Sequence, residues 1–201
     1  DGKLYDAQSN KLIESFKTDA IGGFIISIPI NNLPEIFKIE ITNGIDLYTN
    51  QPYDNILSVI YTKNNAGELG STRLNVTNLT TLVTNMVEEE INTSTTQASE
   101  SFNDIITSKM NIVKDNFNIS SIEDIQNDFI NSQNITIAKI STQLNIITNT
   151  IANLNGGDKK TVMRNISNIL ESSDSFNLSS NETVNSIVSS SIPDSSSNEK
   201  D

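Results

Sequence analysis

The chain has 201 residues, enough for one compact domain or two small ones, and 35% of them are hydrophobic. Its 13 basic and 25 acidic side chains give a formal net charge of −12, so phosphate backbones repel it and nucleic acid is excluded as a partner. Cysteine and histidine are absent, which excludes disulfides, zinc fingers, thiol nucleophiles and a Ser-His-Asp triad. No apolar run is long enough to span a bilayer, so we expect no membrane insertion.

The first third of the chain has the pattern of short β-strands separated by Asn- and Gly-rich turns. Ile- and Phe-rich stretches predict strands at residues 11–17, 23–29, 36–42 and 56–62. In the third of these, polar residues such as Lys38 and Glu40 alternate with apolar ones. This period of two is typical of a strand with one face in the core and the other in solvent.

Near residue 75 the hydrophobic period changes to 3.6, which predicts helices from there to residue 192. Thr77 or Asn78 can cap the first helix, and Thr95 begins the second. Ser121 opens a short third helix, and the longest helix follows, ending at Gly156-Gly157. The residues expected to face the core include Leu79, Leu82, Val83, Met86, Val87, Ala98, Phe102, Ile105, Ile106, Met110, Ile125, Phe129, Ile137, Ile140, Leu144, Ile147, Ile151 and Leu154.

Two further helices are predicted, with Asp158 and Ser180 as their caps. The loop that begins at Gly156 superficially resembles a phosphate-binding loop, but a helix precedes it where that motif needs a strand. A connection between two helices is therefore the better interpretation.

Three short motifs resemble parts of a recurring unit: an Asp/Asn-rich turn at residues 6–10 (DAQSN), a strand entry at 18–24 (TDAIGGF) and a helix start at 76–82 (VTNLTTL). The unit is found in large extracellular surface proteins of bacteria and archaea. It joins an immunoglobulin-like β-domain of the carboxypeptidase-regulatory type to a small helical domain. Asn78 stands where the motif usually has Pro, and the first strand before Asp6 is nearly missing.

The periodicities and this resemblance together predict an α+β fold, with an N-terminal immunoglobulin-like β-sandwich followed by an all-α helical bundle. The expected divisions are residues 1–74 for the sandwich, 75–192 for the helical domain and 193–201 for a flexible tail.

Four residues of the early turns, Asp1, Asp6, Asn10 and Asp19, are candidate oxygen ligands for Ca²⁺, which would be the only cofactor. Their spacing is not that of an EF-hand loop. Turns in which a short polar side chain bonds its own backbone explain the same residues, and both interpretations stay open.

Three adjacent carboxylates, Glu88, Glu89 and Glu90, point around a helix and not to one side, so a solvated face is the expected interpretation. Only Asp and Glu could act as acid or base here. A carbohydrate cleft generally relies on aromatic platforms, and this chain has no Trp, so no enzymatic activity is expected.

We therefore expect a non-catalytic, extracellular structural protein: a subunit of a cell-surface filament or tube, or a module of an adhesin. Because its opening strand is nearly missing, an exposed sheet edge would pair with a strand from a neighbouring subunit. Its partners would be copies of itself or other surface proteins, with glycans as a further option. The alternative is a carbohydrate- or protein-binding module inside a larger surface protein.

Overall fold

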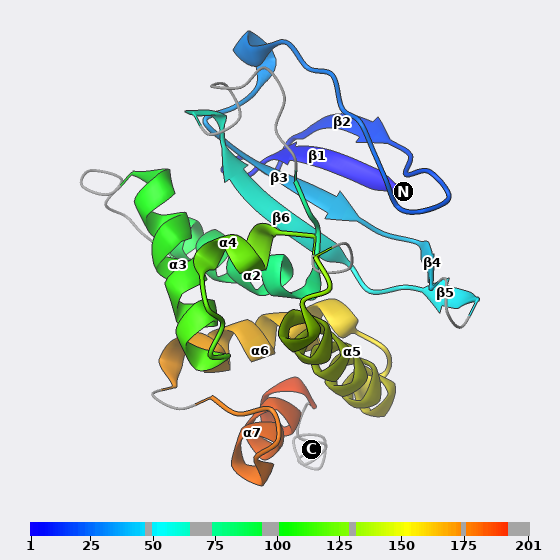
Figure 1. Ribbon diagram of the computed structural model, residues 1–201, viewed down its shortest axis with the longest axis vertical. Helices are drawn as coiled ribbons and strands as arrows, with labels where there is room; N and C mark the ends of the chain where they lie inside the picture. Colours follow the sequence, from blue (N-terminus) through cyan, green and yellow to red (C-terminus); the bar gives the residue numbers. More distant parts are fainter. Residues whose placement is uncertain (47–49, 65–73, 94–100, 129–131, 174–175, 193–201) are drawn as a thin grey trace, which may run out of the picture.

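The computed structural model describes residues 1–46, 50–64, 74–93, 101–128, 132–173 and 176–192 (Figure 1). The described strands are β1 (Gly2–Asp6), β2 (Leu12–Phe16), β3 (Ile36–Ile41), β4 (Gly44–Asp46), β5 (Gln51–Tyr53) and β6 (Leu57–Thr62), with a short 3-10 helix, η1 (Ile30–Asn32). The described helices are α2 (Asn78–Thr93), α3 (Phe102–Asn116), α4 (Ile122–Gln126), α5 (Ile135–Asn155), α6 (Lys159–Ser172) and α7 (Asn181–Ser191). The expected α+β class is confirmed.

Four strands form one antiparallel sheet in the order β2-β1-β3-β6, and β4 and β5 form a separate hairpin. The expectation that the opening strand is nearly missing is wrong. Strand β1 is present and lies inside the sheet, paired with β2 on one side and β3 on the other. The terminal ammonium of Asp1 also donates to the carbonyl oxygen of Thr42 at 2.8 Å. Strand β1 is therefore an interior strand, and β2 and β6 are the edges of this sheet within the described residues.

Three of the predicted strands are found, as β2, β3 and β6, but the one at residues 23–29 is not. This stretch keeps the alternation of half-buried and exposed side chains that is typical of a strand, but it pairs with none of the described strands. The predicted side-chain pattern is therefore found, and the predicted strand is not. Sequence periodicity reports which side chains face a core, whereas a strand is defined by the hydrogen bonds it makes to a neighbour. The β4–β5 hairpin was not predicted.

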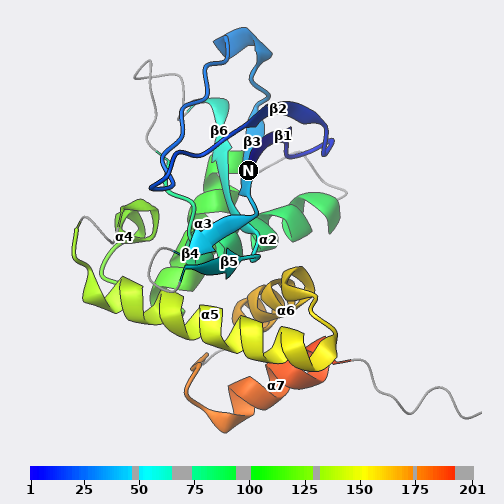
Figure 2. The same cartoon turned by 90° about the vertical axis from the view of Figure 1, so that its right-hand side faces the viewer.

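The two faces of the sheet have different covers (Figure 2). On the outer face, the apolar side chains of Leu4, Phe37, Ile39 and Val59 form one small core. The side chains packed over this core come from loop residues: Phe24, Ile26, Ile28, Leu33, Leu74 and Val76. The described residues place no second sheet opposite the first, so the immunoglobulin-like sandwich is not confirmed.

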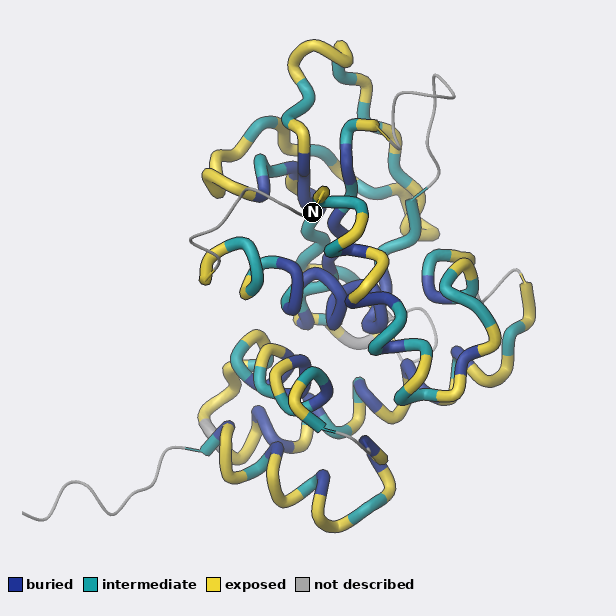
Figure 3. Tube along the Cα trace, turned by 90° about the vertical axis from the view of Figure 1, so that its left-hand side faces the viewer, coloured by how far each residue is buried: buried dark blue, intermediate teal, exposed yellow. Residues whose placement is uncertain are grey.

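The inner face of the sheet packs against α2, which is the most deeply buried helix (Figure 3). Residues 78–84, together with Met86 and Val87, are all buried. The other side of α2 packs against α3, α5 and α6, and α7 lies beyond them at the end of the molecule far from the sheet (Figures 1 and 2). One continuous apolar core joins Ile36 and Ile60 of the sheet to all of these helices.

Helix ends follow the predicted capping residues. Side-chain oxygens of Ser121, Asp158 and Ser180 each accept the backbone N–H three residues later, and Thr77 does the same for α2. Gly156, with φ of 94°, ends α5 in the left-handed conformation that glycine adopts with least strain. The loop after it connects α5 to α6, as predicted. None of the described helices is both long and apolar enough to cross a membrane.

Most residues expected to face the helical core do so, including Leu82, Leu144 and Ile151, which are buried. Leu154 is an exception. It is 66% exposed, although Ile151 and Ala152 just before it are buried. Three predictions fall outside the described residues: the start of a helix at Thr95 with Ala98, the end of another at Phe129, and the tail at 193–201.

Leucines 144 and 154 give a matched test of this packing, because they lie on the same helix with 0% and 66% exposure. We expect Leu144→Ala to lower the free energy of unfolding by about 2–5 kcal/mol, through lost burial and the cavity left behind. Leu154→Ala should change it by less than about 0.5 kcal/mol. Equilibrium unfolding in urea measures both, and equal losses would contradict the packing described for α5.

Candidate assembly surface

The most distinctive surface feature is the stretch of residues 24–28, which we call the outer segment. Phe24, Ile26 and Ile28 are half-buried against the outer face of the sheet, and the ring of Phe24 lies 5.0 Å from that of Phe16. Ile25 and Ser27 point away from the sheet, and Ile25 is 88% exposed. The outer segment is therefore a single strand-like layer over the sheet.

Tight turns hold the outer segment at both ends. Before it, one carboxylate oxygen of Asp19 accepts from the N–H of Ile21 at 2.9 Å and from that of Gly23 at 2.8 Å. The N–H of Asp19 in turn donates to the carbonyl oxygen of Gly23 at 2.8 Å. After it, the N–H of Asn32 donates to the carbonyl oxygen of Pro29 at 2.8 Å. These contacts fix the direction of the chain between Gly23 and Pro29.

Between these anchors the main chain makes no pairing within the described structure. No hydrogen bond joins a backbone N–H or carbonyl of residues 24–28 to any residue that the structure describes. The stretch thus combines the side-chain alternation of a strand with main-chain groups that no described residue uses. Such a row of groups is a template onto which another extended chain can add.

The β6 edge of the four-stranded sheet, by contrast, is blocked by α2. The backbone N–H of Ser58 donates to the hydroxyl oxygen of Thr81 at 2.9 Å, and the hydroxyl of Thr80 donates to the carbonyl oxygen of Ser58 at 2.8 Å. Both threonines belong to the VTNLTTL motif, and nothing in that motif indicated this contact. A further strand cannot reach β6 at this point without displacing the helix.

The other edge, β2, is irregular and charged. Its register to β1 shifts between Leu4 and Tyr5, which leaves Ile13 as an extra, bulged residue. Lys11, Glu14 and Lys17 line the strand and its ends, and the N–H of Ser15 donates to the carboxylate of Glu14 at 3.3 Å. Bulges and charged side chains discourage pairing along an edge. The outer segment carries neither feature.

The four calcium candidates make separate contacts, and only Asp6 and Asn10 share a turn. Asp1 forms an ion pair with Lys17, and Asp6 accepts from the N–H groups of Gln8 at 2.9 Å and Ser9 at 3.1 Å. Asn10 takes a positive φ of 57° in the same turn as Asp6. Asp19 accepts from its own turn, before the outer segment. Among the described residues, no cluster of three or more acidic side chains could hold a metal ion.

The pKa of Asp6 reflects its turn. Partial burial opposes ionisation of the carboxyl, but hydrogen bonds from Ser9 and Gln8 and the charge of Lys11 outweigh it and lower the pKa. The carboxylate is therefore stabilised in its charged form by groups of its own loop.

Two lysines are buried with acidic partners. Lys38, 3% exposed on the inner face of β3, lies 3.0 Å from Glu40 and 2.5 Å from Glu88 of α2, with the ring of Tyr5 at 5.3 Å. The inner face of β3 was expected in solvent, and this expectation is wrong because α2 covers it. Burial opposes the charge, yet the hydrogen bonds and charges of both glutamates raise the pKa of Lys38.

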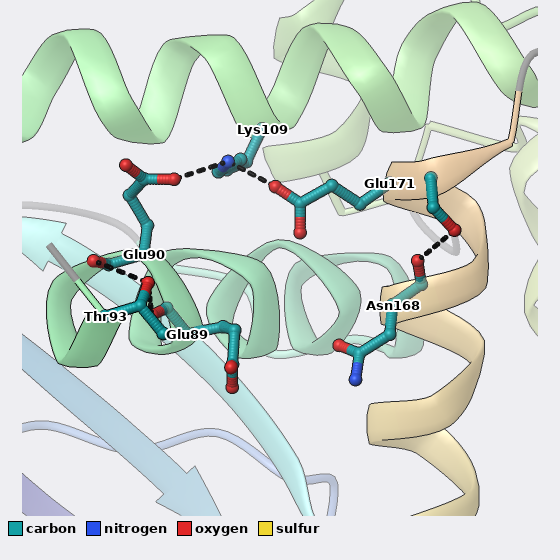
Figure 4. A network of polar contacts seen from close by, with 7 residues as sticks. Glu89, Glu90, Thr93, Lys109, Asn168 and Glu171 are labelled. Carbon is teal, nitrogen blue, oxygen red and sulfur yellow. Dashed lines mark hydrogen bonds and ion pairs between the residues drawn. The ribbon is translucent and has the colours of Figure 1, made fainter. Parts of the chain in front are cut away.

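Lys109 of α3 makes the corresponding contacts near the same, C-terminal end of α2 (Figure 4). Its ammonium lies 3.2 Å from Glu90 and also pairs with Glu171 of α6, so it joins three helices. Burial again opposes the charge, and these two glutamates raise the pKa of Lys109. Glu88, Glu89 and Glu90 diverge as predicted, but only Glu89 is exposed, so a wholly solvated face is wrong.

A small cavity of about 170 Å³ lies where β6, α3 and α4 meet. Tyr61, Ile106, Met110 and Gln126 are among the residues that line it, and none of the described side chains in its lining is charged. Typical ligand pockets are roughly 300–1,000 Å³. This cavity is too small for a drug-sized molecule, and its described lining offers no carboxylate and no cation.

No protein-family model matches the chain, and no curated protein or solved structure matches it. The function is therefore inferred from the chemistry and geometry of the described residues.

Calcium binding at the early turns stays a prediction. Binding to the folded state alone would raise the melting temperature in Ca²⁺ relative to chelator. Thermal melting and light scattering in both conditions measure the effect, with Asp19→Asn as the variant that removes one candidate charge. Identical melting curves and identical size distributions would exclude a structural role for calcium.

Glu88→Gln should destabilise the fold by roughly 1–3 kcal/mol, since a buried ammonium loses one of its two counter-charges. Because the folded pKa of Lys38 is raised above its ordinary 10.5, its stabilisation is present in full below that value and is lost as the pH rises through the folded pKa. Glu89→Gln, at the exposed neighbouring position, is the matched control. Denaturation from pH 7 to 11 measures both, and equal effects would show that the buried pair contributes nothing.

Proposed function

We propose that this chain is a non-catalytic structural module of an extracellular assembly: a subunit of a filament or tube, or a module of an adhesin, that joins its neighbours through β-strand contacts. The observation that carries the proposal is the outer segment, a strand-like stretch whose main-chain groups pair with no described residue and which exposes the apolar side chain of Ile25. The sequence analysis expected the contact between subunits at a sheet edge left by a missing opening strand, whereas this proposal places it at residues 24–28.

The proposal accounts for the outer face of the sheet, which is covered by loop residues and not by a second sheet among the described residues. In a sandwich, two sheets bury their inner faces against each other, whereas here residues 24–28 cover the outer core together with Leu33, Leu74 and Val76 and without a second sheet among the described residues. We infer that residues 24–28 are one strand of an immunoglobulin-like second sheet and that a strand from a neighbour extends this layer. Added main-chain hydrogen bonds give direction to such a contact, and alternate side chains give it specificity.

The described chemistry also favours a non-catalytic role. A lysine acts as nucleophile or base when its pKa is lowered, but the glutamates around Lys38 and Lys109 raise their pKa values and hold both protonated. Among the described residues that line the cavity beside Tyr61, no ionisable pair could act as acid and base. Both buried lysines are thus explained by their contacts between elements of the fold.

Ile25→Lys tests the proposal at the assembly surface, because this exposed residue can change without loss of packing. Native protein should form oligomers whose population rises with concentration. A lysine inside the contact should weaken association tenfold or more, which corresponds to about 1.4 kcal/mol. Light scattering across a concentration series, followed by electron microscopy of the largest species, measures this.

Ile146→Lys is the matched control, since it makes the same charge change at a 58% exposed isoleucine of α5. It should assemble like the native protein, and all three proteins should melt at the same temperature. A native protein that stays monomeric at every concentration, alone and with other surface proteins, would contradict the proposed function. Equal weakening by both variants would show that charge, and not the outer segment, controls association.

A further inference from the structure

We propose that the partner of the outer segment is the same segment of a second copy, paired antiparallel around a two-fold axis at Ile26. This inference rests on the proposed function and names the partner of that same surface. In this register Ile26 lies opposite its own copy, Phe24 opposite Ile28, and Ile25 opposite Ser27. The pairing is self-complementary, as a two-fold contact requires.

Side-chain direction supports this register. Directly opposed residues of an antiparallel pair point to the same face. Phe24, Ile26 and Ile28 all face the sheet, so an even-numbered residue must oppose another even-numbered one. Centring the pair on Ile26 satisfies that condition and aligns the whole of residues 24–28. The apolar rows of both copies then face their own sheets, and Ile25 gains a neighbour across the pair.

Charge favours a second copy at this place. The chain carries a net charge of −12, so two copies repel each other over most of their surfaces. From Ala20 to Pro34, however, the sequence contains no charged residue. Two copies that meet along this stretch, which includes the outer segment, therefore bring none of its side chains into charge repulsion with each other.

The other edges of the molecule fit the outer segment less well. Strand β2 would bring a bulge at Ile13 and the charge of Glu14 against apolar residues. Strand β6 is held at Ser58 by the threonines of α2. A pair of identical outer segments offers instead two regular, uncharged rows of main-chain groups. A two-fold contact closes at two copies, so a dimer is the unit from which any larger assembly is built.

Cysteine cross-linking tests the register directly, because the native chain has no cysteine. Ile25→Cys and Ser27→Cys are made as separate proteins of different mass, since both positions are exposed and tolerate substitution. Opposed β-carbons lie roughly 4.5–5.5 Å apart, within reach of a disulfide, whereas a diagonal pair lies about 7–8 Å apart and is out of reach. Oxidation is followed on each protein alone and on their mixture.

The mixture should form a disulfide-linked heterodimer of the Ile25→Cys and Ser27→Cys proteins at least about tenfold faster than either protein alone forms a homodimer, because only the mixture places opposed positions together. Ile146→Cys, alone and mixed with each, sets the rate of random collision. Melting curves show that every variant is folded.

Faster cross-linking of either protein alone would indicate parallel or shifted pairing and would overturn the antiparallel register. Cross-linking at the collision rate, with native oligomers still seen by light scattering, would overturn self-pairing and leave the proposed function with another partner. Absence of both cross-links and oligomers at every concentration would overturn the inference and the proposed function together.

Discussion

Complete burial of the first half of α2 is the constraint on which the rest of the structure depends. The helix lies between the sheet and three other helices, so even its threonines must satisfy their hydroxyls inside the protein. Thr81 and Thr84 donate to the carbonyl oxygens four residues earlier, at 2.6 and 2.8 Å, and Thr80 donates to Ser58 of β6. The contact to Ser58 satisfies buried polar groups and blocks one edge of the sheet at the same time. The same threonines thus contribute to core packing and leave β6 unavailable at Ser58 for a further strand.

The two buried lysines extend this arrangement. Lys38 joins β3 to α2 through Glu88, and Lys109 joins α3 to α2 and α6 through Glu90 and Glu171. A buried ion pair is weak evidence for stability, because desolvation offsets much of the attraction. Its effect on geometry is stronger, since a glutamate one turn away would leave the ammonium with only one of its two counter-charges. These pairs therefore fix the register of α2 against the sheet and against the neighbouring helices.

Sequence periodicity predicted the helices well because each carries an apolar stripe and a capping side chain, as Ser121 and Asp158 show. It failed where contacts between segments distant in the sequence determine burial and strand pairing. Lys38 occupies a polar row of the kind that usually faces water, and only the position of α2 makes that face buried. Residues 24–28 have a strand pattern without a pairing strand among the described residues, which no local pattern can reveal. Asp6 and Asp19 were candidate metal ligands because turn chemistry and calcium binding use the same carboxylate oxygens.

The stretch wrongly predicted as a paired strand and the proposed assembly surface are the same residues, 24–28, and one physical reason accounts for both. A strand-like stretch that finds no partner among the described residues of its own chain keeps the apolar pattern from which it was predicted. It also keeps the main-chain groups that pairing would have used. Strand β2 is bulged and charged and β6 is blocked, so neither edge of the sheet is an open, regular template. The stretch around Ile25 carries no charged side chain, so the net charge of −12 opposes a contact there less than at faces that carry acidic groups. In the proposed assembly a directed contact then needs no additional recognition element, because main-chain hydrogen bonds would supply its direction and alternate side chains its specificity.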